Sequence, residues 1–287
     1  MRQFIGCAVK KGKEKYVMPE NKSNMPFSLD NHLALSEGSH IKHVIAVVSG
    51  KGGVGKSTVT ALLAVELAKQ GYKVGILDAD LTGASIPYLF GLQGLLRVSH
   101  KGLLEPMETE TFGIKVVSIA LVMENPEMAV IWRGPLLSKA IQQFWTDVNW
   151  GELDYLLVDM PPGTSDVPLT VMQMLPLQGV LIVTSPQDMA RSVVKKAYHM
   201  ANQLQVPVLG LVENMSYVTC PHCGEKFSVF GQKPLSEAAQ EFNVQVCAEM
   251  PLDPQLAELT DKGYIEHVGE NMGLTLQSMV EALASMP

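Results

Sequence analysis

The segment Gly50–Thr58, GKGGVGKST, constrains the fold more than any other stretch of the 287 residues. It follows the apolar run His43–Val48 and fits G-x-x-x-x-G-K-[ST], a loop whose backbone N–H groups cradle phosphates. Glycines allow this approach because they lack a Cβ, and the positive end of the following helix points at the same anion. Residues 58–70 are strong helix formers and Gly71 follows them. We therefore expect a strand, a phosphate-binding loop and a helix in succession.

The residues of this loop have separate predicted roles. Lys56 would neutralise the β- and γ-phosphates, and the Ser57 hydroxyl would ligate Mg²⁺. Lys51 is unusual, because from the far side of the loop it reaches a nucleotide on a facing subunit more easily than its own. The nucleotide-binding residues predicted from the loop are Gly50, Lys51, Gly52, Gly53, Val54, Gly55, Lys56, Ser57 and Thr58.

Composition narrows the class of protein. Apolar residues make up 47% and charged residues 18%, as in an ordinary globular protein. The formal charge of −7 argues against general nucleic-acid binding. No apolar run approaches the roughly 20 residues that span a bilayer, and the N-terminus lacks a signal-peptide pattern. Four cysteines do not make a disulfide framework in a chain of this length, so we expect a cytoplasmic protein with no membrane partner.

The order of apolar and helical segments predicts the fold class. Residues 1–40 are polar and irregular, and we expect a flexible leader followed by one P-loop ATPase domain over 41–287. Near-continuously apolar strands that alternate with helices indicate a three-layer, doubly wound, mostly parallel sheet. The strands expected after 43–48 are 73–77, 114–119, 155–158, 180–184, 207–213 and 244–250. The expected helices are 57–70, 135–147, 189–204, 234–242, 254–262 and 272–284. Residues 214–233 break this rhythm, and we expect an irregular, turn-rich insert there.

Three aspartates follow two of the expected strands. Asp78 and Asp80 come after 73–77, and Asp159 comes after 155–158. In open α/β sheets ligands bind at the carboxyl ends of strands, and carboxylates suit Mg²⁺. A single aspartate in such a place is usually a helix N-cap, but three beside a P-loop favour a metal and nucleotide site.

Cys220 and Cys223 form a C-x-x-C pair within the irregular segment. Such a pair is half of a four-thiolate site for Zn²⁺ or for an iron–sulfur cluster, and the CPxCG form by itself favours zinc. A redox role is less expected, since that motif normally opens a helix. Cys247 falls on an expected strand as a buried small hydrophobe, and Cys7 has no assignment. Because one chain offers half a site, a two-fold dimer would complete it.

These motifs together resemble a known family. The form xKGGxGK[ST] is similar to the deviant Walker A ATPases, which include the nitrogenase iron protein, MinD and ParA. With DADxxGxSIP, the WRGP segment at 132–135, DMPPGTSD, VENMS and CPxCG, the chain from about residue 41 onward resembles the Mrp/ApbC (Nbp-type) iron–sulfur cluster carrier ATPases. Ala84 replaces the proline that is usual in the DADxxGPSIP segment.

The resemblance implies roles for further residues. Lys51 would reach the partner's phosphates across a homodimer, Asp80 would orient the attacking water, and Asp78 and Asp159 would support Mg²⁺. The resemblance alone also carries over the base-framing residues Asn214, Pro251 and Asp253. The absence of an N-K-x-D motif favours ATP over GTP.

The leading hypothesis is an ATP-hydrolysing, Mg²⁺-dependent carrier of an iron–sulfur cluster. The family implies a cluster, expected to be [4Fe–4S], that bridges Cys220 and Cys223 of two subunits and passes to apo-proteins. One alternative is a MinD/ParA-like positioning ATPase, against which the tail without Lys or Arg argues. The other alternative is an ATPase dimer with structural zinc at the cysteine pair.

Overall fold

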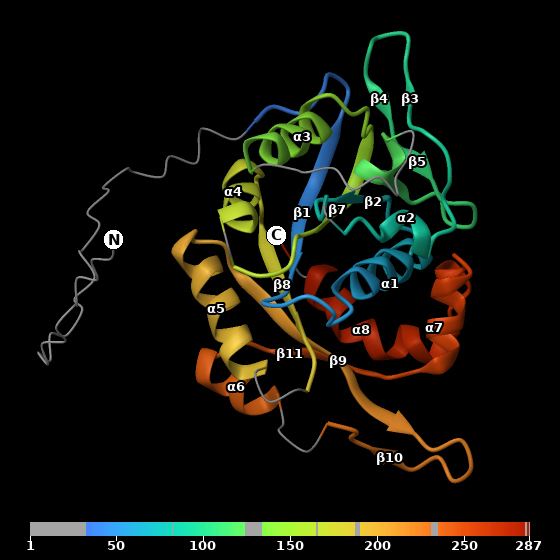
Figure 1. The fold of residues 1–287 in the computed structure, drawn as a ribbon, viewed down its shortest axis with the longest axis vertical. Coiled ribbons are helices and arrows are strands. Elements are labelled where there is room, and N and C mark those ends of the chain that lie inside the picture. The colour runs from blue at the N-terminus through green and yellow to red at the C-terminus, as the bar shows by residue number, and fades with distance from the viewer. Residues whose placement is uncertain are drawn as a thin grey trace, which may run out of the picture. The chain divides into compact units, whose positions relative to one another are not determined.

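A mostly parallel β-sheet forms the centre of the fold (Figure 1). The computed structural model describes residues 33–81, 83–123, 134–164, 166–186, 190–230, 235–284 and 286. Within them the sheet has nine strands in the order β10-β9-β8-β1-β7-β2-β6-β5, with β11 paired to β9. The strands are β1 (His40–Val48), β2 (Val74–Asp78), β5 (Met107–Glu108), β6 (Lys115–Ser118), β7 (Glu152–Asp159), β8 (Gly179–Thr184), β9 (Val208–Thr219), β10 (Lys226–Phe227) and β11 (Val246–Pro251). The short strands β3 (Arg97–Val98) and β4 (Leu104–Glu105) form a separate hairpin.

The P-loop strand β1 lies between β7 and β8 and is parallel to both. In register, Val47 of β1 lies beside Asp159 of β7 and Leu181 of β8. The antiparallel pairs involve the short strands β5 and β10. The carboxyl ends of β1, β2 and β7 therefore meet at one edge of the sheet, where the P-loop begins.

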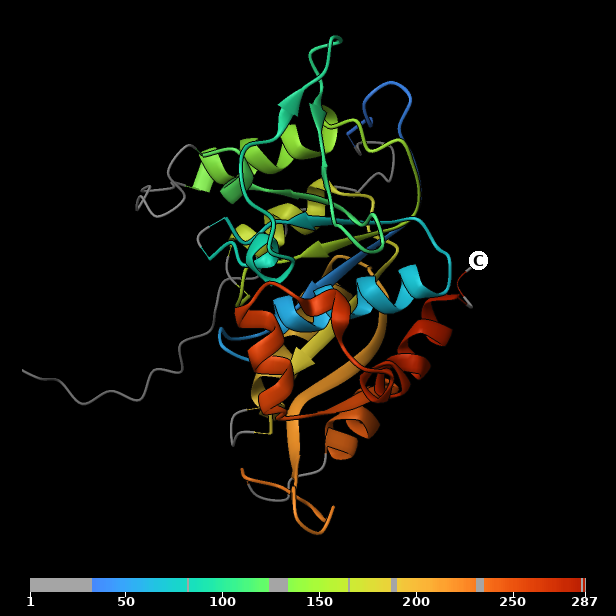
Figure 2. The same cartoon turned by 90° about the vertical axis from the view of Figure 1, so that its right-hand side faces the viewer.

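Helices cover both faces of the sheet (Figures 1 and 2). One face packs on α1 (Lys56–Lys69), α2 (Ile86–Leu89), α7 (Pro254–Asp261) and α8 (Glu270–Ala284). The other packs on α3 (Gly134–Thr146), α4 (Asp166–Met174), α5 (Ala190–Gln203) and α6 (Leu235–Phe242). Short 3₁₀ helices lie at η2 (Ile119–Leu121) and η3 (Ile265–His267). The central strands are apolar almost throughout because both of their faces are buried.

The fold class predicted from the sequence is confirmed, and the expected strands and helices lie within a few residues of the observed ones. The prediction of an irregular insert over 214–233 is wrong for its first part, because β9 continues to Thr219. The strand β10 then turns back beside it, and Figures 1 and 2 show this hairpin projecting beyond the helical layers. The sequence patterns also missed α2 and α4.

The end of the predicted leader contacts the folded domain. The Trp145 indole N–H donates to the Leu33 carbonyl at 2.7 Å, and the His40 N–H donates to the Gly151 carbonyl at 2.8 Å. The domain boundary at residue 40 stays a prediction, and Cys7, Trp132 and Arg133 lie outside the described residues. Among the described helices, none is both long enough and apolar enough to cross a membrane.

Candidate nucleotide site and cysteine pair

The P-loop ends in a residue whose position requires glycine. Gly55 has φ +77° and immediately precedes α1. A Cβ there would lie 2.2 Å from Nδ2 of Asn214. That amide donates to the Val54 carbonyl at 3.0 Å, so β9 is tied directly to the loop. Both the left-handed conformation and the close approach of Asn214 therefore disfavour a side chain at this position.

Lys56, the invariant lysine of the motif, lies in a buried ion pair. Its Nζ is 2.8 Å from Oδ1 of Asp159, and the two side chains are 5% and 0% exposed. The same carboxylate accepts hydrogen bonds from the Ser57 hydroxyl at 2.6 Å and from the Thr60 hydroxyl at 2.8 Å. Three donors from α1 therefore converge on the end of β7, and the loop, α1 and β7 form one connected polar site.

Asp78 lies beside Asp159, since the two residues are in register on neighbouring parallel strands. Its carboxyl accepts hydrogen bonds from the Ser118 hydroxyl at 2.9 Å and from the Asp80 N–H at 3.2 Å. Burial, and then the negative charge of Asp159, raise the pKa of Asp78 to about 8. Burial and the neighbouring charge therefore favour the protonated form of this carboxyl, whereas a bound cation would favour its ionised form.

Asp80 begins the turn that follows β2. It is 9% exposed, and its Oδ1 accepts a hydrogen bond from the Gly83 N–H at 3.2 Å. The segment after Asp159 contacts the start of the P-loop, because the Gly163 N–H donates to the Ser49 carbonyl at 2.8 Å. The segments that follow Asp78 and Asp159 thus both begin at the ends of strands next to the loop.

The donor set at this edge fits Mg²⁺. It consists of the Ser57 hydroxyl and the carboxylates of Asp78 and Asp159, which are hard oxygen ligands of the kind that Mg²⁺ prefers. Together with the phosphates of a nucleotide, these residues would hold the ion, which would supply positive charge against the phosphate oxygens.

The residues expected to frame the base fall in two places. Pro251 and Asp253 line one groove of about 800 Å³ between the β9–β10 hairpin and α7. Asp253 also caps α7, because its Oδ1 accepts a hydrogen bond from the Gln255 N–H at 2.8 Å. Asn214 contacts the P-loop carbonyl instead, and its Oδ1 accepts the Met215 N–H at 3.0 Å. Their role toward a base stays a prediction.

Cys220 and Cys223 lie at the tip of the β9–β10 hairpin. The knuckle is closed by the Cys220 N–H, which donates to the Glu225 carbonyl at 2.9 Å, and by the Gly224 N–H, which donates to the Cys220 carbonyl at 2.9 Å. Hydrogen bonds to the sulfur from the backbone of Cys223 and His222 lower the pKa of the Cys220 thiol, which favours the thiolate that binds metals.

The cysteine pair has no further ligand within reach in the part of the chain that the structure describes. No three His, Cys, Asp or Glu side chains converge there in a way that could hold a metal ion. Cys247 is 2% exposed on β11, which confirms the prediction of a buried hydrophobe. The two cysteines thus supply two thiols at an exposed tip.

Sequence reasoning missed several polar residues of the site. Thr60 lies one helical turn after Ser57, so helical spacing could have placed both hydroxyls on Asp159. Ser118 ends β6, beside β2, and the rule of polar residues at strand ends could have found it. At the end of β8, Thr184 and Ser185 have buried hydroxyl oxygens that find no hydrogen-bond partner among the described residues. No sequence signal singles out these two.

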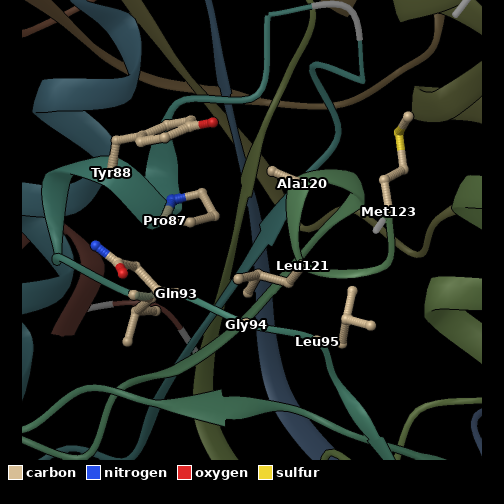
Figure 3. Close-up of a pocket in the computed structure, with 9 residues that line it drawn as sticks. Pro87, Tyr88, Gln93, Gly94, Leu95, Ala120, Leu121 and Met123 are labelled. Carbon is tan, nitrogen blue, oxygen red and sulfur yellow. The ribbon is translucent and has the colours of Figure 1, made fainter. Parts of the chain in front are cut away.

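An apolar hollow of about 420 Å³ lies beside α2 (Figure 3). Pro87 and Tyr88 of α2 face Leu121 and Met123 across it, with Leu95 at its side. Among the described residues that line it there is no carboxylate, histidine or cysteine. These residues therefore offer none of the groups that phosphate and metal chemistry needs.

Comparison with known proteins decides the family. The family described as ParA, NUBPL iron-transfer P-loop NTPase, matches residues 40–285. The chain belongs to this family. An iron-sulfur cluster carrier protein from Clostridium perfringens is 45% identical over 273 residues, which cover 92% of this chain and 95% of the relative. These matches confirm the resemblance to the Mrp/ApbC carriers that the motifs indicated.

Solved structures agree with this membership in the NUBPL iron-transfer P-loop NTPases. A nucleotide-binding protein from Archaeoglobus fulgidus, solved in complex with ADP and with Co found in it, is 51% identical. The match covers 79% of this chain and 88% of that one, with a TM-score of 0.71. The cell division ATPase MinD of Pyrococcus furiosus has the same fold, with 22% identity, a TM-score of 0.60 and coverage of 85% and 99%.

Proposed function

We propose that this chain is an ATP-hydrolysing carrier of an iron–sulfur cluster. Two copies would hold the cluster between their Cys220 and Cys223 pairs and pass it to apo-proteins. The observation that carries the proposal is the course of β9: its Asn214 bonds the P-loop, and the same strand leads directly into Cys220. A nucleotide at the loop and a cargo at the cysteines would therefore act on one continuous segment. The name of the Clostridium perfringens relative supports the choice of cargo.

The polar site supports hydrolysis of a nucleoside triphosphate. Lys56 lies against Asp159, and its ammonium would turn to the β- and γ-phosphates of a bound nucleotide. Asp159 and Ser57 would then be available to Mg²⁺. Asp80 would orient the attacking water, and Lys51 would reach the phosphates of the facing copy. ATP is the proposed nucleotide.

The surroundings of the cysteines support a second copy as the missing half of the site. One chain supplies two thiols, whereas a [4Fe–4S] cluster takes four. Three large apolar side chains just beyond Cys223 are exposed: Phe227 by 51%, Val229 by 52% and Phe230 by 42%. Apolar groups clustered on a protein surface mark interaction sites, and a symmetric partner would cover this cluster and bring its own cysteines.

Anaerobic reconstitution with iron and sulfide tests the proposal. The wild-type chain is expected to take up about two irons per copy, half of a four-iron cluster, with the absorption of a [4Fe–4S] centre. Cys220→Ser and Cys223→Ser should each abolish this uptake, whereas Cys247→Ser, which changes a buried thiol, should retain it. Protein purified without oxygen that contains zinc and takes up no iron would overturn the cargo and favour structural zinc.

A further inference from the structure

The groove that contains Pro251 and Asp253 has a wall made by the cysteine hairpin itself. On the hairpin side it is lined by Tyr217, Val218, Thr219, Pro221 and Lys226. On the other side lie Leu252, in the connection from β11 to α7, and Leu256 of α7. The groove of about 800 Å³ is in the size range of small-molecule sites. Anything bound in it would touch the segment that carries the thiols.

Tyr217 occupies the middle of this segment. It lies three residues after Asn214, which bonds the P-loop, and three residues before Cys220. Its backbone is fixed to the opposite wall, because its carbonyl accepts the Leu252 N–H at 2.8 Å and it is in register with Pro251. Its side chain is half-buried in the groove. The residue is therefore anchored by its backbone while one part of its ring remains accessible.

The ring of Tyr217 contacts Lys226 of β10, the second strand of the hairpin. Nζ of Lys226 lies 4.3 Å from the ring centroid and donates to the Tyr217 hydroxyl at 3.3 Å. Lys226 is on β10, three residues after Cys223. Within the described residues β10 pairs with β9 only at Lys226 with Thr219 and Phe227 with Val218. Because so short a hairpin is marginal by itself, the Lys226 contact is a substantial part of what positions the returning strand.

We propose that Tyr217 is a positioning residue that couples a purine base in this groove to the geometry of the cysteine hairpin. The inference rests on the proposed function, since it takes the groove's ligand to be the base of the nucleotide. Stacking of a base on an aromatic ring is generally stronger than an exposed cation–π contact. A base that takes the ring face displaces Lys226, so β10 loses an anchor and the access to both thiols changes. Nucleotide binding thereby alters cargo exchange without a direct contact between base and sulfur.

The reactivity of the two thiols in cluster-free protein tests this coupling. The full chain with Cys7→Ser is titrated with the thiol reagent dithionitrobenzoate, with and without Mg-ADP, and Cys247 reacts slowly because it is buried. We expect Mg-ADP to change the rate at Cys220 and Cys223 by about two- to fivefold, the range that an exposed cation–π contact allows. Tyr217→Leu should abolish this response while fluorescent ADP still binds through the P-loop. Tyr217→Phe, which keeps the ring, should keep the response, as should the matched control Tyr264→Leu, which removes an exposed tyrosine that does not line the groove.

A second variant keeps the test decisive if Tyr217→Leu does not fold. Lys226→Met removes the cation and keeps the stem, so its thiols without nucleotide should already react at the rate of the ADP-bound wild type. The coupling is overturned if the wild type shows no ADP response, if Tyr217→Leu responds like the wild type, or if Lys226→Met reacts like the nucleotide-free wild type. These outcomes are independent of iron uptake, which tests the cargo itself.

Discussion

The P-loop and the cysteine hairpin differ in how many of their site residues one chain supplies. The segment from Asn214 to Cys223 connects them, because Asn214 contacts the P-loop and Cys220 and Cys223 lie in the hairpin. At the P-loop, Lys56, Ser57 and Thr60 all contact the carboxylate of Asp159 within a buried site. At the hairpin, the described residues bring no third metal-binding side chain to the two thiols, and the neighbouring apolar side chains are exposed.

The difference separates the phosphate site, to which a facing copy would add only Lys51, from the cysteine site, of which a facing copy would supply half. The carboxylate, the lysine and the hydroxyls needed for phosphate and Mg²⁺ come from β2, β7 and α1 of the same chain. Removing one of these groups should affect hydrolysis and leave the thiols intact. Changes at the hairpin should affect the thiols and leave hydrolysis intact, because the hairpin projects outside the core.

The largest expected effect is the loss of hydrolysis in Lys56→Met. Removing the cation that we propose faces the phosphates should lower the ATP hydrolysis rate by about 100-fold or more. Iron uptake after anaerobic reconstitution should remain at the wild-type value, since the hairpin is unchanged. Phosphate release and iron content are measured on the same preparation. Loss of both hydrolysis and iron uptake in Lys56→Met would show that the P-loop and the cysteine hairpin do not act separately.

A smaller effect should distinguish two glycines with nearly the same backbone conformation. Gly55 has φ +77° and Gly224 has φ +75°, but a Cβ meets Asn214 only at Gly55 and nothing within 4 Å at Gly224. Alanine at either position costs about 1–2 kcal/mol of left-handed strain. Gly55→Ala should cost about 1 kcal/mol more, because Asn214 must give up its hydrogen bond to Val54. Urea unfolding gives the loss of unfolding free energy for both variants. Equal losses would show that a Cβ at Gly55 does not disturb the Asn214 contact.

The smallest effect concerns the other end of β7, where Asp154 pairs with Lys42 at 2.5 Å. The Lys42 hydrogen bond and then the Lys73 N–H lower the pKa of Asp154 below its ordinary value of 3.8. A lowered carboxyl pKa stabilises the fold above pH 3.8, and this stabilisation is lost as the pH falls through the folded-state value. Asp154→Asn should cost about 0.5–1 kcal/mol at pH 7, because the pair is solvated.

The pH profile checks this prediction. The difference in unfolding free energy between wild type and Asp154→Asn should begin to shrink as the pH falls below 3.8, and it should vanish below the lowered folded-state pKa of Asp154. It should also fall in 1 M salt, which screens exposed charges. A difference that is constant with pH would show that the loss is one of packing.

Much of the nucleotide site could be predicted because local sequence determines it. The pattern Gly50–Ser57 specifies a loop between a strand and a helix, and the two Asp-terminated strands place Asp78 and Asp159 at the same edge. Residue spacing could not predict that β2 and β7 are neighbours, because this depends on the order of the strands in the sheet. The contribution of Ser118 depends on the same order.

The hairpin was harder to predict because residues typical of turns follow directly on residues that form a strand. Pro221, Gly224 and the cysteines indicate turns, and they obscured the strand that runs from Val208 to Thr219. The contact between Lys226 and Tyr217 joins two strands across the knuckle and has no periodic signature. The role of Asn214 at the P-loop is likewise a tertiary contact over 160 residues.

Native mass spectrometry of the anaerobically reconstituted chain with ATP tests most directly whether two copies share one cluster. We expect a species of twice 31.2 kDa that carries one four-iron, four-sulfide cluster, and its absence when Cys220 and Cys223 are both serine. Single chains that each carry a complete cluster, or dimers that remain fully loaded without these cysteines, would contradict the shared site.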